Sequence, residues 1–523
     1  MTLKRTLSIV LAIAFVFSCT SMAVFATETV ENNAVLSDTT ENVEVTETPM
    51  EEGTEASEET EVEEDEYAGY GNKASAKYLS YKAGQFTSYL TFINHFSDTE
   101  IIGKEVTLDI NNCIADSKGA ETKSVADDDN VAKDAVVIKE NGYVDLRINV
   151  EREGLYHIGL EYLPIKENPI DIEFSFKIDG DTQYREATSL MLKRTWIEDK
   201  TPDEDGNWPQ RDITGNEVSP DVIEALKWTN YTLHDNIFSS DDDMLFYLAP
   251  GEHSIKINVL RESVALASIT LGGNEQLPSY NSVYAEYQKK GYKPVSKDTN
   301  ITLHAEYSSL KSDNSLVMSA EYTASTTNGT GDQLHYAKTR FNVLGGEAWK
   351  FPNDWIEYEI DVAHSGLYNL SFKYKQDYVE GMNVYRKVYI DGEIPFEEFS
   401  RVTFKPSSVW KNYTVSDKSG NPYYVYLEKG KHTIRLNATF GPIAETLQML
   451  DSQTTSLNKW YMKIVQITGP MPDTLRDYDL HKTITGLIDG FEDIRDNLQR
   501  CYDTLIEING GEGGSISFVE VLI

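Results

Sequence analysis

Alternating apolar and polar residues predict β-strands over much of this chain. Residues 144–150 (VDLRINV) alternate in this way, and residues 355–362 (WIEYEIDV) do the same. Because the side chains of a strand point alternately to opposite faces, such runs predict half-buried strands. An Asp-Gly pair follows an apolar run at Asp179-Gly180 and again at Asp391-Gly392, which is a hairpin signal. Many short strands bounded by turns indicate an antiparallel sandwich or jelly roll.

The strand pattern occurs twice. Residues 144–180 align without a gap to residues 356–392, and residues 247–258 align to 426–437 with a different offset. The change of offset indicates an insertion in the first copy, roughly between Trp196 and Met244. The repeated unit is far too long for a solenoid. We therefore predict two tandem jelly-roll domains of one topology, at residues 67–275 (the first repeat) and 276–469 (the second repeat).

Two equivalences test this duplication. Gly154 matches Gly366, so these glycines should fall on equivalent turns. His253 and His432 also match, each in a Gly-x-His-x-Ile setting. A shared place in a repeat indicates a shared packing role, rather than a metal-binding or catalytic one.

Two segments near the C-terminus are predicted to be helical. Residues 442–458 contain no Gly or Pro after Pro442 and have helical apolar spacing, and a last strand is predicted at residues 461–467. Apolar residues then recur every three or four positions, which predicts an amphipathic helix over residues 480–508. Its apolar stripe needs a partner. Because residues 515–523 resemble the start of another element, we expect the partner to lie beyond Ile523 and the stripe to be exposed.

The N-terminus predicts export. Lys4 and Arg5 precede a short apolar run, and residues 24–26 (VFA) form a cleavage site, so residues 1–26 read as a signal peptide. Cys19 lies in a weak lipoprotein-like box, which leaves a lipid anchor open beside a Cys inside a removed signal. Residues 27–66 hold sixteen Asp and Glu and no Lys or Arg, a composition typical of a disordered acidic tether.

Charge and cysteine content narrow the function classes. The formal net charge is −38, and it stays strongly negative without the tether. Nucleic acids and anionic membranes require clustered Lys and Arg, so both are excluded as partners. Beyond the signal, Cys113 and Cys501 fall in different predicted modules. We expect two largely buried thiols and no disulfide framework.

Several short motifs resemble known extracellular families. Residues 304–307 (HAEY), 354–358 (DWIEY) and 427–437 resemble the galactose-binding-like carbohydrate-binding modules of secreted bacterial proteins. This resemblance implies a jelly roll that binds a glycan or oligosaccharide. With residues 461–488, the chain resembles the front half of large extracellular solute-binding proteins of Gram-positive sugar ABC transporters. That resemblance implies a permease partner, reached through a two-lobed domain that this sequence lacks.

A sugar site would combine aromatic platforms with a few polar groups. The candidates lie in predicted loops, and those of the second repeat could form one rim; each ring could instead pack a loop or the core. They are Trp349, Trp410 and Tyr413 in the second repeat, and Trp208 and Trp228 within the acidic insertion of the first repeat.

Jelly rolls of the resembled class often carry a structural calcium ion, which requires six to eight oxygen ligands. The resemblance places Glu306 at the early carboxylate ligand, although the matching late Asp is not evident near residues 465–469. The acidic runs at residues 127–129 and 241–243 lack the spacing of a ligand loop. We expect them to be solvated turns.

Catalytic motifs are absent from the sequence. It contains neither a Gly-x-Ser-x-Gly elbow nor a His-Glu-x-x-His pair. The leading interpretation is a non-catalytic, surface-associated carbohydrate-binding protein, the accessory front part of a sugar transporter's binding protein. The alternative is a structural or adhesive module that binds protein or spaces other domains. Aromatic side chains gathered on one surface would favour the first interpretation.

Overall fold

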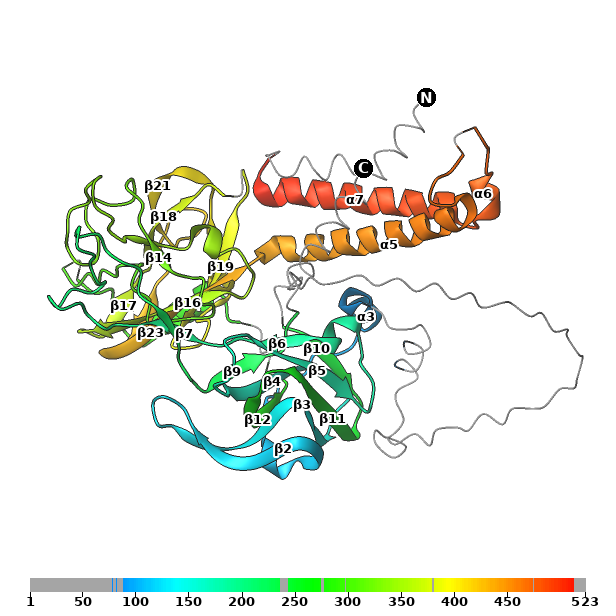
Figure 1. The fold of residues 1–523 in the computed structure, drawn as a ribbon, viewed down its shortest axis with the longest axis horizontal. Coiled ribbons are helices and arrows are strands. Elements are labelled where there is room, and N and C mark those ends of the chain that lie inside the picture. Colours follow the sequence, from blue (N-terminus) through cyan, green and yellow to red (C-terminus); the bar gives the residue numbers. More distant parts are fainter. Residues whose placement is uncertain are drawn as a thin grey trace, which may run out of the picture. The chain divides into compact units, whose positions relative to one another are not determined.

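The computed structural model describes Tyr78, Tyr81 and residues 88–511, except 236–242, 274–276, 297, 379–380 and 474. The predicted signal peptide, the tether and the final element therefore lie outside the described residues. The acidic run 241–243 lies outside them except for its last residue. The described chain is mainly β, with antiparallel sheets, as predicted (Figure 1). Residues 454–489 form one compact unit, and the other described residues form a second unit.

The first repeat is built on one large antiparallel sheet. Its central path runs β10-β4-β12-β3-β11-β5-β6, with β1 on β12, β2 on β3 and β9 on β4. The strands are β1 (Val106–Asp109), β2 (Ile114–Ala126), β3 (Ala132–Val150), β4 (Gly154–Pro164), β5 (Ile172–Ile178), β6 (Leu190–Leu192), β9 (Thr229–Thr232), β10 (Leu245–Leu248), β11 (Gly251–Arg261) and β12 (Val264–Leu271).

The second repeat has a sheet ordered β20-β19-β23-β16-β13, which β7 and β8 of the first repeat extend. Three two-stranded sheets, β14–β15, β17–β22 and β18–β21, complete it. The strands are β7 (Trp196–Glu198), β8 (Val222–Glu224), β13 (Leu310–Lys311), β14 (Met318–Ser319), β15 (Val343–Leu344), β16 (Trp355–Val362), β17 (Gly366–Tyr368), β18 (Ser371–Gln376), β19 (Val384–Ile390), β20 (Val402–Phe404), β21 (Ser407–Thr414), β22 (Val425–Leu427) and β23 (Gly430–Thr439).

The two repeats share one topology, as the duplication predicts. β3 pairs with β11 as β16 pairs with β23, and His253 and His432 occupy the same register in these pairs. Each histidine Nδ1 lies 2.6–2.7 Å from the aspartate of the adjacent hairpin turn, Asp179 or Asp391. Each Nε2 lies 2.7–2.8 Å from a backbone carbonyl four residues earlier. The shared role is to fix the turn, as expected.

Gly154 and Gly366 also fall on equivalent turns. A Cβ atom at Gly154 would lie 2.6 Å from Ile102, and one at Gly366 would lie 2.6 Å from Val295. Both glycines therefore permit a close approach of the chain that precedes the sandwich. The backbone N–H of the next residue donates to that chain in both repeats.

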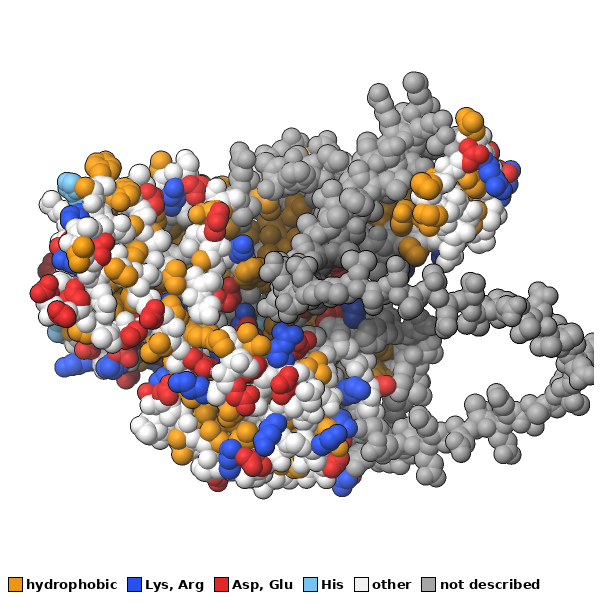
Figure 2. All heavy atoms as spheres, in the orientation of Figure 1, with side chains coloured by type: hydrophobic (Ala, Val, Ile, Leu, Met, Phe, Trp, Pro, Cys, Tyr) orange, Lys and Arg blue, Asp and Glu red, His pale blue; other side chains and the backbone are white. Residues whose placement is uncertain are grey.

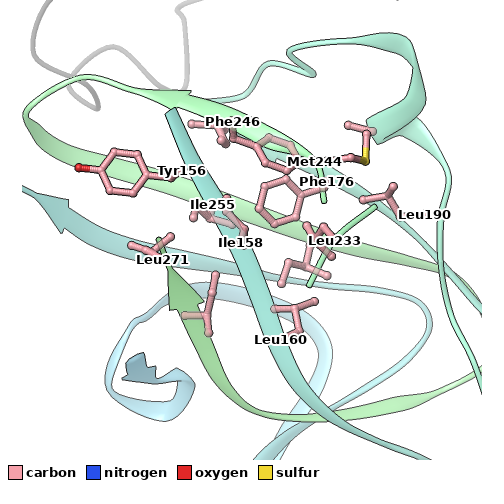
Figure 3. Close-up of a cluster of buried hydrophobic side chains, with 14 of the residues drawn as sticks. Tyr156, Ile158, Leu160, Phe176, Leu190, Leu233, Met244, Phe246, Ile255 and Leu271 are labelled. Carbon is pink, nitrogen blue, oxygen red and sulfur yellow. The ribbon is translucent and has the colours of Figure 1, made fainter. Parts of the chain in front are cut away.

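Each repeat encloses a separate hydrophobic core. In the first, side chains from β4, β5, β10 and β11 meet in one cluster, where the rings of Phe176 and Phe246 lie 5.0 Å apart (Figure 3). The second core is formed mainly by β16, β22, β23 and residues 396–404, which include β20. A short helix precedes each sandwich: α3 (Tyr89–His95) and α4 (Tyr280–Lys289). In both repeats a Glu at an equivalent position accepts from the first N–H of this helix.

The structure corrects the C-terminal prediction. Residues 461–467 are not a strand but the end of α5 (Ala444–Thr468). No Gly or Pro interrupts these residues, and Trp460, Ile464 and Ile467 have helical spacing. The second predicted helix is present as α6 (Leu480–Thr483) and α7 (Leu487–Asn509). Gly486, with φ of 75°, lies in the break between them.

The expected exposure of the α7 stripe is wrong. Leu498 is 3 % exposed and Leu487 is 6 % exposed. For residues 490–509 the partner is the first part of α5, where Asn497 donates to Gln453 and Cys501 contacts the Thr446 carbonyl. Both thiols are free; Cys501 is buried and Cys113 half-buried. Among the described helices, none is long and apolar enough to cross a membrane.

Candidate functional site

Trp410 lies on strand β21 of the second repeat, and not in a loop as predicted. Its side chain is half-buried, and its indole N–H donates to Oε2 of Glu321 at 3.0 Å. This hydrogen bond fixes the orientation of the ring. The side-chain amine of Lys375, on β18, lies 3.8 Å from the same carboxylate and 2.9 Å from Asp377.

The Glu321 carboxylate is held ionised. The hydroxyl and backbone N–H of Thr323 donate to it at 2.5 and 2.9 Å, and with Trp410 and Lys375 they lower the pKa of Glu321 to about 2. The backbone of Glu321 is clamped in turn by the Asn342 side chain, through hydrogen bonds of 2.9 and 3.0 Å. The polar group beside Trp410 is therefore rigidly positioned.

Two exposed tyrosines adjoin this point. Tyr322 follows Glu321 in the chain and is 45 % exposed, and its ring stacks with that of Tyr336 at 5.8 Å. Tyr336 is 90 % exposed. We call Trp410, Tyr322 and Tyr336 the platform. Figure 2 shows hydrophobic side chains among the polar ones on the surface of the second repeat. Sequence reasoning missed both tyrosines because they lie in irregular chain without periodicity.

The other candidates of the second repeat do not join Trp410 in one rim. Tyr413 is three positions further along β21 and therefore points to the opposite face. It packs against Tyr374 and Phe404 at the edge of the core. Trp349 donates its N–H to the Asp354 carbonyl at 2.9 Å, and the Arg386 guanidinium covers its ring at 4.2 Å. Trp349 thus has the contacts of a packing residue.

Trp228 is the counterpart of Trp410. Tyr231 pairs with Leu160 on β4 as Tyr413 pairs with Phe372 on β18, so the tryptophan three residues earlier is equivalent in both repeats. The contacts differ, however. The N–H of Trp228 donates to the Val131 carbonyl at 3.0 Å, and the ring packs against a small buried cluster of the first repeat.

The insertion that carries Trp208 is not a free acidic loop. It supplies β7 and β8 to the second repeat's sheet, and Glu198 on β7 forms a buried ion pair with Lys311 on β13. Further along, buried Glu217 accepts from Asn328 at 2.8 Å and from the Phe341 N–H at 2.6 Å. The insertion therefore bridges the two repeats.

Trp208 belongs to this bridge. Its N–H donates to the Asp199 carbonyl at 2.8 Å, and its ring contacts that of Tyr307 at 5.1 Å between centroids. These contacts give Trp208 a packing role between the insertion and the second repeat. They leave its use in ligand binding a prediction.

The calcium ion expected at Glu306 also stays a prediction. Glu306 is 2 % exposed, and its carboxylate accepts from the Gly329 N–H at 2.7 Å. Two carboxylates that also act on the neighbouring Tyr307, Glu217 and Asp332, face the guanidinium of Arg340. Among the described residues, no group of three or more His, Cys, Asp or Glu side chains is arranged to hold a metal ion. The acidic run 127–129 forms a turn, as predicted, in which Asp127 accepts from two backbone N–H groups.

No protein-family model and no curated protein matches this chain. Solved structures that match part of this chain include a family 35 carbohydrate-binding module from Clostridium thermocellum. It has 11 % identity, covers 32 % of this chain and 97 % of its own, and has a TM-score of 0.20. A C-terminal family 6 module of LamC from Zobellia galactanivorans has 11 % identity, covers 32 % and 99 %, and has a TM-score of 0.19. At these scores the likeness carries no functional argument, so function is argued from the site.

Proposed function

We propose that this chain is an extracellular, non-catalytic carbohydrate-binding protein whose second repeat binds glycan at the platform. The carrying observation is the half-buried Trp410, fixed by Glu321, the residue that directly precedes the exposed Tyr322 and its stacked partner Tyr336. Aromatic faces stack on the apolar face of a sugar ring, while carboxylates and amines hydrogen-bond its hydroxyls. Glu321 and Lys375 supply such polar groups beside Trp410.

The charge state of Glu321 favours binding over hydrolysis. A glycoside hydrolase requires a carboxylic acid with a raised pKa, so that it can protonate the leaving group. The pKa of Glu321 is instead lowered to about 2 by its hydrogen-bond donors. The platform is also open to solvent, which suits the reversible capture of a chain.

Two narrower roles are part of this proposal. The resemblance of residues 461–488 supports an accessory position in an ABC-transporter sugar-binding protein, which would bring a permease as partner. The N-terminal sequence supports export, with anchoring through Cys19 as one route to the cell surface. The alternative function is a structural or adhesive module.

The test is a glycan array on the full chain, followed by calorimetry on each positive glycan. Trp410→Ala should weaken binding by at least about fivefold, because a stacked ring contributes about 1 kcal/mol or more. Trp228→Ala is the matched control, since it removes the equivalent ring of the first repeat and should leave the affinity unchanged.

Circular dichroism of both variants separates loss of binding from loss of fold. Binding that survives Trp410→Ala in a folded chain would contradict the platform. Absence of binding to any glycan would favour the structural or adhesive module.

A further inference from the structure

A second candidate site lies in a cleft between the two repeats. Its volume is about 2220 Å³, and both repeats contribute to its lining. Sites for drug-sized ligands typically measure about 300–1,000 Å³. The cleft is therefore large enough for an oligomeric ligand, and the platform residues are not part of it.

One wall of the cleft is a row across the second repeat's sheet. Asn437 on β23 pairs with Lys387 on β19 and with Trp355 on β16. Directly paired residues of neighbouring strands point to the same face, so these three side chains stand side by side. In the next row, the Arg435 guanidinium lies 3.9 Å from the Trp355 ring centroid and pairs with Glu357 at 2.8 Å.

Asn437 carries an unsatisfied group. Its Oδ1 atom is buried and has no hydrogen-bond partner among the residues that the structure describes. A buried polar group without a partner is costly, so most such groups are hydrogen-bonded in native proteins. The Asn437 side chain lines the cleft, so a rotation of its amide would bring this acceptor within reach of a ligand hydroxyl.

The equivalent amide of the first repeat has a side-chain partner. The equivalent residue, Asn258, pairs with Ser175, and its Nδ2 donates to the Ser175 hydroxyl at 3.1 Å. In the second repeat the position of Ser175 is occupied by Lys387. The cation above the aromatic ring is kept in both repeats, since Lys256 lies 3.9 Å from the Tyr143 ring centroid. The two rows thus differ in the side-chain partner of the equivalent amide.

The opposite wall comes from the first repeat. The Tyr231 hydroxyl lies 3.2 Å from Nε2 of His234, and His234 Nδ1 lies 3.0 Å from the Thr232 carbonyl. Burial, together with the nearby charges of Lys387 and Lys193, lowers the pKa of His234 to about 4. At neutral pH this wall therefore presents an uncharged imidazole and a phenol hydroxyl.

The charges around the cleft nearly balance. Among the described lining residues, seven are Lys or Arg and six are Asp or Glu, although the whole chain carries −38. Arg435 is paired with Glu357, and Lys193 lies 3.1 Å from Asp171 and 3.6 Å from Asp354. A ligand without net charge suits such a balanced lining better than an anion or a cation does.

We infer that this cleft is a second binding site, which takes an uncharged oligosaccharide and satisfies Asn437 with one of its hydroxyls. The inference goes beyond the platform, because it involves different residues and requires both repeats. The platform would bind a glycan chain at the surface, while the cleft would hold a defined length of it.

The test uses the full chain with Trp410→Ala, which weakens platform binding so that binding at the cleft can be measured. The probes are neutral hexasaccharides of β-1,4-glucose, β-1,3-glucose, β-1,4-mannose and β-1,3-galactose, measured by calorimetry. We expect one of them to bind with a stoichiometry of one per chain. Adding Asn437→Ala should weaken this binding about five- to tenfold, the effect of one lost hydrogen bond. Asn258→Ala is the matched control in the first repeat and should have no effect.

A second variant guards against misfolding. Lys387→Ser installs beside Asn437 the hydroxyl that the first repeat already has, so it should weaken binding while the melting temperature is kept or raised. No binding of any hexasaccharide to the Trp410→Ala chain would overturn the cleft site. Equal losses with Asn258→Ala and Asn437→Ala would also overturn it. Tighter binding of a hexagalacturonate than of every neutral probe would overturn the ligand class.

If the parent chain binds while Trp410→Ala changes nothing and Asn437→Ala weakens the binding about five- to tenfold, the platform fails and the cleft stands. If instead Trp410→Ala weakens binding and Asn437→Ala changes nothing, the cleft fails and the platform stands. Each failure is therefore distinguishable from the other.

Discussion

The two repeats keep the same framework and differ at their surfaces. The His–Asp contact at the hairpin turn has the same geometry in both, at His253 and His432. The equivalent tryptophans, however, have different surroundings: Trp228 packs on a buried cluster, whereas Trp410 hydrogen-bonds a rigid carboxylate beside exposed rings. The comparison teaches that the His–Asp turn contacts belong to the shared fold. Side chains outside the cores, such as the two tryptophans, have different contacts in the two repeats.

The bridge between the repeats adds an asymmetry. β7 and β8 belong to the insertion of the first repeat but pair within the sheet of the second. Main-chain pairing of this kind resembles the addition of a strand to an exposed sheet edge. Here it also covers that edge, which would otherwise invite pairing with another chain.

The largest effect is expected from breaking the bridge. Glu198→Ala leaves Lys311, which is fully buried, without its carboxylate, and this should lower the free energy of unfolding by about 3–5 kcal/mol. Urea denaturation followed by tryptophan fluorescence measures it. The double variant Glu198→Met with Lys311→Met should recover most of the stability. A loss below about 1 kcal/mol for Glu198→Ala would show that the bridge adds little.

An intermediate loss of stability is expected for Trp228→Ala, and it should be larger than the loss for Trp410→Ala. Trp228→Ala removes a ring packed against the cluster of Ala135, Val137 and Leu163, and should cost about 2 kcal/mol of stability. Trp410→Ala should cost less than about 1 kcal/mol, because its ring belongs to none of the described core clusters. Thermal unfolding of the two variants compares them directly. Equal losses would contradict the different roles assigned to the rings.

The smallest expected effect is the pH dependence of stability that comes from the His–Asp contact at the shared turn. Burial by itself would lower the pKa of His253, but its hydrogen bonds to Asp179 and the Ala249 carbonyl raise it above 6.5. The resulting stability is fully present below pH 6.5, and it is lost as the pH rises through the raised pKa of the folded state. Asp179→Asn should lower the free energy of unfolding at low pH by about 1 kcal/mol. It should also reduce the loss of stability as the pH rises.

The second repeat supplies the control for this pH effect. His432 has a raised pKa for the same reason, but half of the Asp391 side chain is exposed to solvent. Exposed ion pairs contribute little, so Asp391→Asn should change stability by less than about 0.5 kcal/mol. Denaturant unfolding at pH 5.5 and pH 8 measures both variants. A steeper pH dependence in Asp179→Asn than in the parent would contradict the assignment.

The local residue pattern was sufficient to predict the main strands and hairpin turns that the repeats share. Alternation at residues 144–150 and 355–362 indicated β3 and β16, and the Asp-Gly pairs indicated the hairpins, because side-chain alternation and turn conformation depend on neighbouring residues. The 3.6-residue period likewise indicated most of α6 and α7. The same kind of reasoning failed at residues 461–467, where an uninterrupted helix overrode a short run that resembled a strand.

What the sequence by itself determined is the duplication, the strand-rich class and the paired turns, since these follow from periodicity and matched positions. Only the tertiary structure decided that the acidic insertion joins the neighbouring sheet, that Trp410 hydrogen-bonds Glu321, and that Asn437 lines a cleft. These features depend on contacts between residues about 90 to 200 positions apart. Such contacts leave no periodic trace in a single sequence, because they depend on how the repeats pack rather than on local conformation.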